Sequence, residues 1–273
     1  MTNFLIRRHR RITRYRDISR SELRQLLKNA ASGDRQAYLA LVEPYFDLVL
    51  ENLYFAGFTA QPDRLARANQ IFHQVWQRIA FTTRVSDFER LLYHALCHLP
   101  AQEGTFLDTL PRQLSRLSPR DRFLLVAREM EDWHPRWLVL CCRTPRPQLN
   151  RSLLYTRNRL TGFPKHSLSR SDNAVLRELS RSLDEVWQES HLKMLRQHLQ
   201  ERPALREWKS LWLEKRCELI ELRQDLRLPE EVRNPVLAAL LQSIRESSPL
   251  QPNPIHHLLN AVRFQAYPRF SLS

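Results

Sequence analysis

The stretch Leu117–Leu160, LSPRDRFLLVAREMEDWHPRWLVLCCRTPRPQLNRSLLYTRNRL, decides the fold that the sequence predicts. Its apolar residues recur mostly at intervals of three and four, the period of an amphipathic helix. The pattern predicts a short helical hairpin, a turn, and a basic helix over Gln148–Leu160. The residues of this last helix that we expect to face the core are Leu149, Leu153 and Leu160.

The same helical period extends over most of the 273 residues, and the chain contains only four glycines. An all-α fold with two small helical domains and a helical C-terminal extension is therefore predicted. Asn234-Pro235 predicts the start of one helix in that extension, because proline is favoured at the first helical position. The expected segments are a basic N-terminal arm at 1–20, a helical domain at 21–99, a linker at 100–109, a second helical domain at 110–163 and the extension at 164–273.

The formal net charge is +14, and arginine contributes much more of it than lysine. Such an excess favours a polyanionic partner, because neutralised phosphates release condensed counterions. Six arginines lie between Arg7 and Arg16, which is typical either of a solvated tail or of a nucleic-acid arm. No stretch approaches the roughly eighteen apolar residues of a membrane span, and the four cysteines lack C-x-x-C spacing. We expect no membrane insertion and a cytoplasmic location.

Motifs of enzymes are missing from the sequence: it has no phosphate loop, no G-x-G-x-x-G, no G-x-S-x-G and no H-E-x-x-H. The acidic run 129–132 lacks a partnered base and is interpreted as a helix end or loop. His94, Cys97 and His98 share one helical face and are of zinc-ligand type, but no further ligands follow. Core and surface roles are therefore favoured for them, and we predict no metal, no cofactor and no enzymatic activity.

The predicted helix Gln148–Leu160 has the residue types of a DNA-reading helix. Its first turns would present short polar and basic side chains to the major groove, where Gln and Asn suit adenine and Arg suits guanine. Basic side chains nearer its end suit phosphates. An arginine-rich surface helix is the alternative interpretation. The candidate DNA-binding residues are Gln148, Asn150, Arg151, Arg157 and Arg159.

Leu117–Leu160 resembles the DNA-reading C-terminal domain of bacterial sigma factors, with its Leu-x-Pro-Arg-x-Arg opening and alternating Arg and apolar positions at its end. A second resemblance lies upstream, in Gly33-Asp34-x-x-Ala37-Tyr38, in the run NQIFHQVW at 69–76, and in Phe88-x-x-Leu91-Leu92-Tyr93. Together the two blocks cover roughly residues 21–162. Their order and spacing are similar to those of extracytoplasmic-function (ECF) sigma factors.

This resemblance implies a factor for transcription initiation or regulation, which recruits RNA polymerase to promoters. It implies promoter DNA and core RNA polymerase as partners, and an anti-sigma or other regulatory protein as a further one. The residues that fall on the polymerase-binding helix are Asp63, Asn69, Gln70, Phe72 and Trp76. The residues near the promoter-melting segment are Phe88, Leu91, Leu92 and Tyr93.

Several positions depart from the family pattern. Leu65 and Ala66 stand where the family has a Glu-Asp pair, which would meet basic groups on the polymerase. Arg143 replaces the turn glycine, and Pro145 and Pro147 flank the start of the recognition helix. These departures favour an alternative function, a sigma-derived protein–protein adaptor that has lost promoter recognition. A general basic nucleic-acid-binding protein is the third possibility.

Overall fold

The computed structural model describes residues 18–99, 104–163, 168–184, 187–247 and 249. These residues form helices and no strand, which confirms the predicted all-α fold. The first half contains α1 (Arg20–Ala31), α2 (Arg35–Val42), η2 (Glu43–Tyr45), α3 (Phe46–Phe55), α4 (Gln61–Gln77), η3 (Ile79–Phe81) and α5 (Val85–Cys97). The second contains α6 (Thr109–Ser115), α7 (Pro119–Leu125), η4 (Val126–Met130), α8 (Pro135–Cys142), α9 (Arg146–Thr161), α10 (Arg170–Ser182), α11 (Glu189–Glu201), α12 (Pro203–Leu226) and α13 (Glu230–Arg245).

Short polar residues fix where the first helices begin. The Ser19 hydroxyl accepts a hydrogen bond from the Glu22 amide at 3.1 Å, and the Glu22 carboxylate accepts from the Ser19 amide at 2.6 Å. This reciprocal pair is a capping box at the start of α1. Gly33 follows α1 with a φ of 99°, a conformation that glycine adopts readily. The Asp34 carboxylate then accepts hydrogen bonds from two backbone amides of the first turn of α2.

The predicted helix start at Asn234-Pro235 is wrong. Helix α13 begins at Glu230, and Pro235 lies inside it. The cap position is Pro229 in extended conformation, and two glutamates occupy the first turn, where negative charge is favoured. The helix thus begins about one turn before the proline.

A single hydrophobic cluster runs through both segments that the sequence assigns to separate domains. Helix α5 packs against α7 and α8. The Tyr93 and Phe123 rings lie 5.0 Å apart between α5 and α7, and Tyr45 meets Trp133 edge-on at 6.1 Å. The boundary between 21–99 and 110–163 therefore marks a change of sequence pattern and no break in the core.

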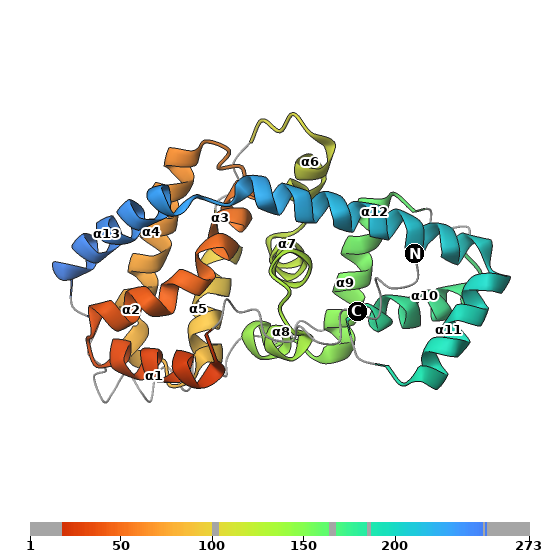
Figure 1. Cartoon of the computed structure of the whole chain (residues 1–273), viewed down its shortest axis with the longest axis horizontal. Helices are drawn as coiled ribbons and strands as arrows, with labels where there is room; N and C mark the ends of the chain where they lie inside the picture. The colour runs from red at the N-terminus through yellow and green to blue at the C-terminus, as the bar shows by residue number, and fades with distance from the viewer. Residues whose placement is uncertain (1–17, 100–103, 164–167, 185–186, 248, 250–273) are drawn as a thin grey trace, which may run out of the picture.

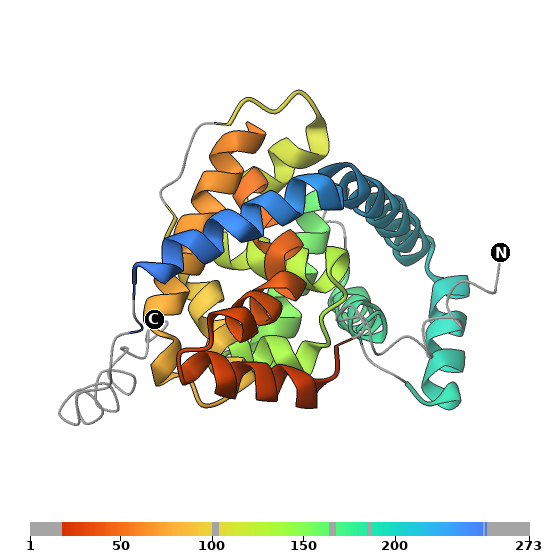
Figure 2. The same ribbon diagram turned by 60° about the vertical axis from the view of Figure 1, so that its left-hand side comes forward.

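The C-terminal helices α12 and α13 run across the molecule and join its two ends (Figures 1 and 2). Helix α12 contacts α9, η4 and α3, while α13 packs on α2 and α4. Ion pairs accompany this packing: Arg223 lies 2.7 Å from Glu131, and Arg233 lies 2.8 Å from the buried Asp47. We call α12 and α13 the strap, because they run across the molecule. Arginines of the strap pair with acids of α3 and of the turn after η4.

Within the described ranges, no helix combines the length and the apolar character needed to span a bilayer. The basic arm predicted at 1–20 falls outside the described residues except for its last three positions, and residues 100–103 of the predicted linker also fall outside them.

One buried carboxyl group joins the start of α1 to α5, α8 and the turn before α3. Glu89 is fully buried; it accepts a hydrogen bond from the Tyr45 hydroxyl at 3.2 Å and pairs with Arg20 at 3.3 Å. The Arg20 guanidinium in turn lies over the Trp137 ring of α8, 4.5 Å from its centroid. Burial raises the pKa of Glu89 to about 7, against the opposing effects of Arg20 and Tyr45.

This raised pKa makes stability depend on pH in a defined direction. Between the ordinary pKa of 4.5 and the folded value of about 7, the folded state holds the proton more tightly than the unfolded chain. The contribution is therefore fully present below pH 4.5 and is lost as the pH rises through 7, by up to about 3 kcal/mol. Glu89→Gln abolishes this loss, so the free energy of unfolding of the parent minus that of the variant should decrease from about pH 5 to about pH 8.

Urea unfolding at both pH values measures this difference. The exposed Glu43→Gln is the matched control and should show the same difference at both pH values. A pH-independent difference for Glu89→Gln would show that Glu89 is ionised in the folded protein over the whole range.

Candidate nucleic-acid interface

Helices α8 and α9 are joined by a tight turn of residues 143–145. Arg143 ends α8 with φ of 47° and ψ of 40°, in the left-handed region that favours glycine, and its amide donates to the Val139 carbonyl. Pro135 is the first residue of α8, where its missing amide costs no helical hydrogen bond. The two prolines around the start of α9 also lie at or before its first turn, so neither interrupts the helix.

Helix α9 exposes one continuous stripe along its length. The stripe consists of Gln148, Arg151, Tyr155 and Arg159, which recur at intervals of three and four and are all exposed. Arg159 donates to the Tyr155 hydroxyl at 3.1 Å, and its guanidinium lies 5.9 Å from the centroid of that ring. Asn150 is half-buried beside this stripe. The inward positions Leu149, Leu153 and Leu160 are buried, as the sequence predicts.

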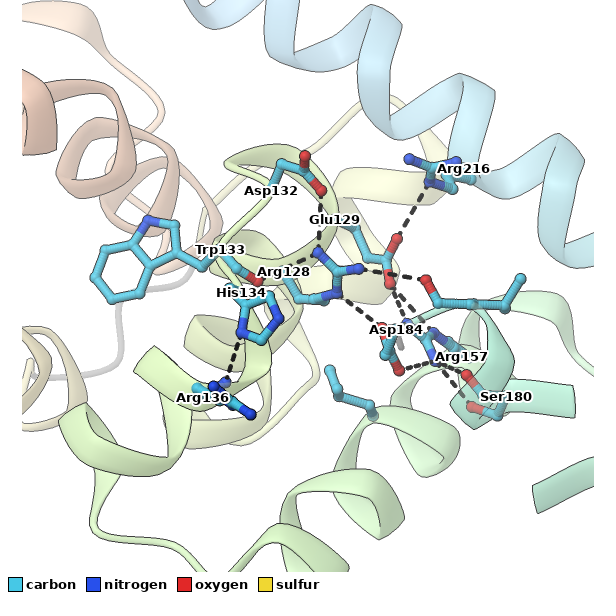
Figure 3. A network of polar contacts seen from close by, with 12 residues as sticks. Arg128, Glu129, Asp132, Trp133, His134, Arg136, Arg157, Ser180, Asp184 and Arg216 are labelled. Carbon is cyan, nitrogen blue, oxygen red and sulfur yellow. Dashed lines mark hydrogen bonds and ion pairs between the residues drawn. The ribbon is translucent and has the colours of Figure 1, made fainter. Parts of the chain in front are cut away.

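Arg157 does not belong to the exposed stripe. Its side chain is 0% exposed, and all three nitrogens of its guanidinium donate hydrogen bonds inside the protein (Figure 3). It pairs with Asp184 at 2.7 Å and also with Glu129, and it donates to the Ser180 hydroxyl at 2.8 Å. Its guanidinium also lies over the Trp212 ring. The prediction that Arg157 contacts DNA is wrong, because the side chain cannot reach the surface.

A second arginine, Arg128 of η4, completes this buried group (Figure 3). Its Nε donates to Asp184 at 2.7 Å, and its Nη1 lies 3.0 Å from Asp132. Arg216 of α12 pairs with the far oxygen of Glu129 at 3.3 Å. We call Arg128, Glu129, Arg157 and Asp184 the buried ionic network; it joins η4, α9 and the end of α10, and Arg216 ties it to α12.

Each charge of the buried ionic network keeps its partners ionised. Burial alone would raise the pKa of Asp184, but the ion pair with Arg157 lowers it to about 2. Burial opposes ionisation of Glu129 as well, and Arg157 and Arg128 nevertheless hold its pKa below 4.5. The two carboxylates likewise raise the pKa of Arg157 against the effect of burial. The network therefore contributes structure, and its acids are unavailable as proton acceptors near neutral pH.

The structure places the candidate polymerase-binding residues on both faces of α4. Phe72 and Trp76 are 0% exposed, and the Trp76 indole donates to the Ser247 carbonyl at 3.1 Å just beyond α13. These two residues belong to the core, so their predicted contact with polymerase is wrong. Asp63 and Gln70 are exposed, and Asn69 is half-buried.

The candidate promoter-melting residues all lie on α5, which α7 and α8 cover. Phe88 and Leu92 are 0% exposed, while Leu91 and Tyr93 are half-buried. Burial raises the pKa of the Tyr93 hydroxyl well above its usual value. In this conformation Phe88 and Leu92 cannot meet a separated DNA strand, so their predicted role in melting is wrong, whereas Leu91 and Tyr93 keep a partly exposed surface.

His94, Cys97 and His98, which are of zinc-ligand type, lie at the end of α5 and make other contacts there. The His98 ring approaches the His94 carbonyl at 2.8 Å. Burial raises the pKa of the Cys97 thiol to about 12. Among the residues that the structure describes, no three His, Cys, Asp or Glu side chains are placed to hold a metal ion.

The buried ionic network predicts that Arg157→Ala strongly lowers the free energy of unfolding, an effect that a role in DNA recognition would not explain. Arg157→Ala leaves Asp184 and Glu129 buried with less compensating charge, and removing one partner of a buried pair costs about 3–5 kcal/mol. The midpoint of urea unfolding should fall accordingly.

Arg159→Ala is the matched control, because the same residue type is lost two positions later from the exposed face. It should change the free energy of unfolding by less than about 0.5 kcal/mol. Equal effects of the two variants would contradict the structural role of Arg157.

Comparison of the chain with family models, with curated proteins and with solved structures gives no match. The resemblance to ECF sigma factors therefore stays a prediction from the motifs quoted above.

Proposed function

We propose that the chain is a DNA-binding transcription regulator, similar to an ECF sigma factor, that contacts duplex DNA through the exposed stripe of α9. The observation that carries the proposal is the outward placement of Gln148, Arg151 and Arg159 on a helix that follows a tight turn. Gln148 and Arg151 lie near the start of α9, where such a helix meets base edges. Arg159 lies near its end, where basic side chains meet phosphates.

The charge of the chain supports the same partner. Some arginines, including Arg128 and Arg157 of the buried ionic network, are buried and pair with acids. These pairs cancel in the formal net charge, so the value of +14 is the excess of basic over acidic residues that remains. The excess positive charge favours association with a polyanion, and its contribution decreases as salt increases.

Recruitment of core RNA polymerase is the finer form of this proposal. On α4, the exposed Asp63 and Gln70 are the candidates for that contact. The packing of α5 against α7 and α8 favours binding of closed duplex DNA over strand separation in the described conformation. It also favours the adaptor alternative, which requires no melting segment.

Two single substitutions should affect DNA binding in different ways. Arg159→Ala removes a phosphate contact, so it should weaken binding to all duplexes and reduce the slope of log K against log salt by about one. Arg151→Ala should relax sequence preference by about 1–3 kcal/mol at the affected base pair. Fluorescence anisotropy on random and genomic duplexes, titrated with salt, measures both effects.

Arg24→Ala is the control, because it removes an equal charge from the exposed face of α1. It should leave sequence preference unchanged. If Arg151→Ala and Arg159→Ala both bind DNA as the parent chain does, α9 is not the DNA-binding helix.

Co-purification with core RNA polymerase separates the two finer possibilities. The sigma-like function predicts both polymerase association and a sequence preference on DNA. Association without a preference would identify an adaptor, whereas DNA preference without association would identify a regulator that acts apart from the polymerase.

A further inference from the structure

A groove of about 730 Å³ lies between α9, α10 and α11, the helices at the right of Figure 1. Its volume falls within the range of pockets that hold small organic ligands. The start of α9 forms one wall with Arg146, Asn150 and Arg151, and α10 contributes Arg177 to the opposite wall. We call it the α9–α11 groove. Arg151 therefore belongs both to the exposed stripe of α9 and to the lining of the groove.

The charge of the lining favours an anion. Four arginines and two histidines line the α9–α11 groove, against a single acid, Glu178. Glu178 is already engaged by Arg181, at 3.2 Å. Arginine presents a planar fork of donors that suits phosphate oxygens, so a phosphate group fits this lining better than an uncharged ligand does.

Part of the lining of the groove is apolar or aromatic. Leu154, Val175 and Leu195 contribute aliphatic surface, and the half-buried Trp187 contributes an indole ring. The Trp187 ring meets the His191 ring edge-on at 5.5 Å. A flat ring bound beside this indole would gain contact with an aromatic surface.

Two shielded polar atoms of lining residues add specificity for a heteroaromatic ring. The Trp187 Nε1 donor and the Asn150 Oδ1 acceptor are inaccessible to solvent, and neither has a hydrogen-bond partner among the described residues. Buried polar atoms normally have such partners. A donor and an acceptor in one groove match the edge of a nitrogenous base.

We propose that the α9–α11 groove binds a nucleotide: the arginines hold the phosphate, and the base lies beside Trp187. Because Arg151 belongs to both surfaces, a bound nucleotide competes with duplex DNA for α9. The binding site itself is independent of the proposed function; only the competition rests on it.

The probe for this site is adenosine monophosphate carrying a methylanthraniloyl fluorophore on its ribose, added to the full chain. Energy transfer from tryptophan should report binding. Arg177→Ala should raise the Kd about tenfold through loss of a charge-assisted contact. Ala174→Trp, at an exposed position of the lining, should strongly weaken binding by obstructing the groove.

Lys193→Ala, on an exposed part of α11 outside the lining, is the control and should leave the Kd within about twofold. Adenosine and inorganic phosphate, added separately, should each displace the probe only weakly. A short single-stranded oligonucleotide that displaces it more strongly than the mononucleotide would identify the ligand as a nucleotide within a strand. Absence of binding, or equal binding by parent and Ala174→Trp, would overturn the proposal.

The competition has its own measurement. Saturating mononucleotide should raise the Kd for duplex DNA about fivefold or more in the parent, since Arg151 is withdrawn, and should leave Ala174→Trp unaffected. Arg159→Ala, which lies outside the groove, should keep the parent affinity for the probe. Probe binding without any effect on DNA would overturn the competition alone, whereas loss of DNA preference in the parent would count against the proposed function and leave the groove intact.

Discussion

The ion pairs of Arg157 with Asp184 and Glu129 are the interaction on which the second half of the fold depends. They join a helix of the predicted helix-turn-helix to η4 and to the end of α10, without solvent between them. Two buried charges of each sign are tolerated there because they neutralise one another and because backbone and hydroxyl groups accept the remaining donors. Helix α9 is consequently held on its inner side at a fixed rotation. That rotation determines which residues form its exposed stripe.

Fixing α9 in this way has a second effect, on the surface beside it. Because α10 is tied to α9 through Asp184 and Ser180, the arginines of α10 and those at the start of α9 line the same α9–α11 groove. Sites built on rigid elements keep their geometry more precisely than sites on loops. The exposed stripe of α9 and the groove are thus two surfaces of one immobilised helix, joined at Arg151. A ligand that occupied Arg151 at one surface would withdraw it from the other without any movement of the fold.

The sequence predicts most helices and the inner face of α9, because their apolar spacing is regular and local. It fails where a charged residue occupies an inner position. Arg157 stands four residues after Leu153 and three before Leu160, on the same face of α9, and this spacing is the signal that could have shown its burial. Its partner Asp184 lies 27 positions further along the chain, which no local pattern reveals. The same limit applies to the groove, whose three walls meet only after the chain has folded.

The strap gives the chain an order of assembly. Asp47 is buried beneath the strap and accepts a hydrogen bond from Arg233, which follows 186 positions later. At ordinary rates of synthesis Asp47 is made roughly 10–40 s before Arg233. Over that interval the strap is absent, so the surfaces of α2, α3 and α4 that it covers are exposed. The N-terminal half therefore gains its packing against the strap only after α12 and α13 have been synthesised.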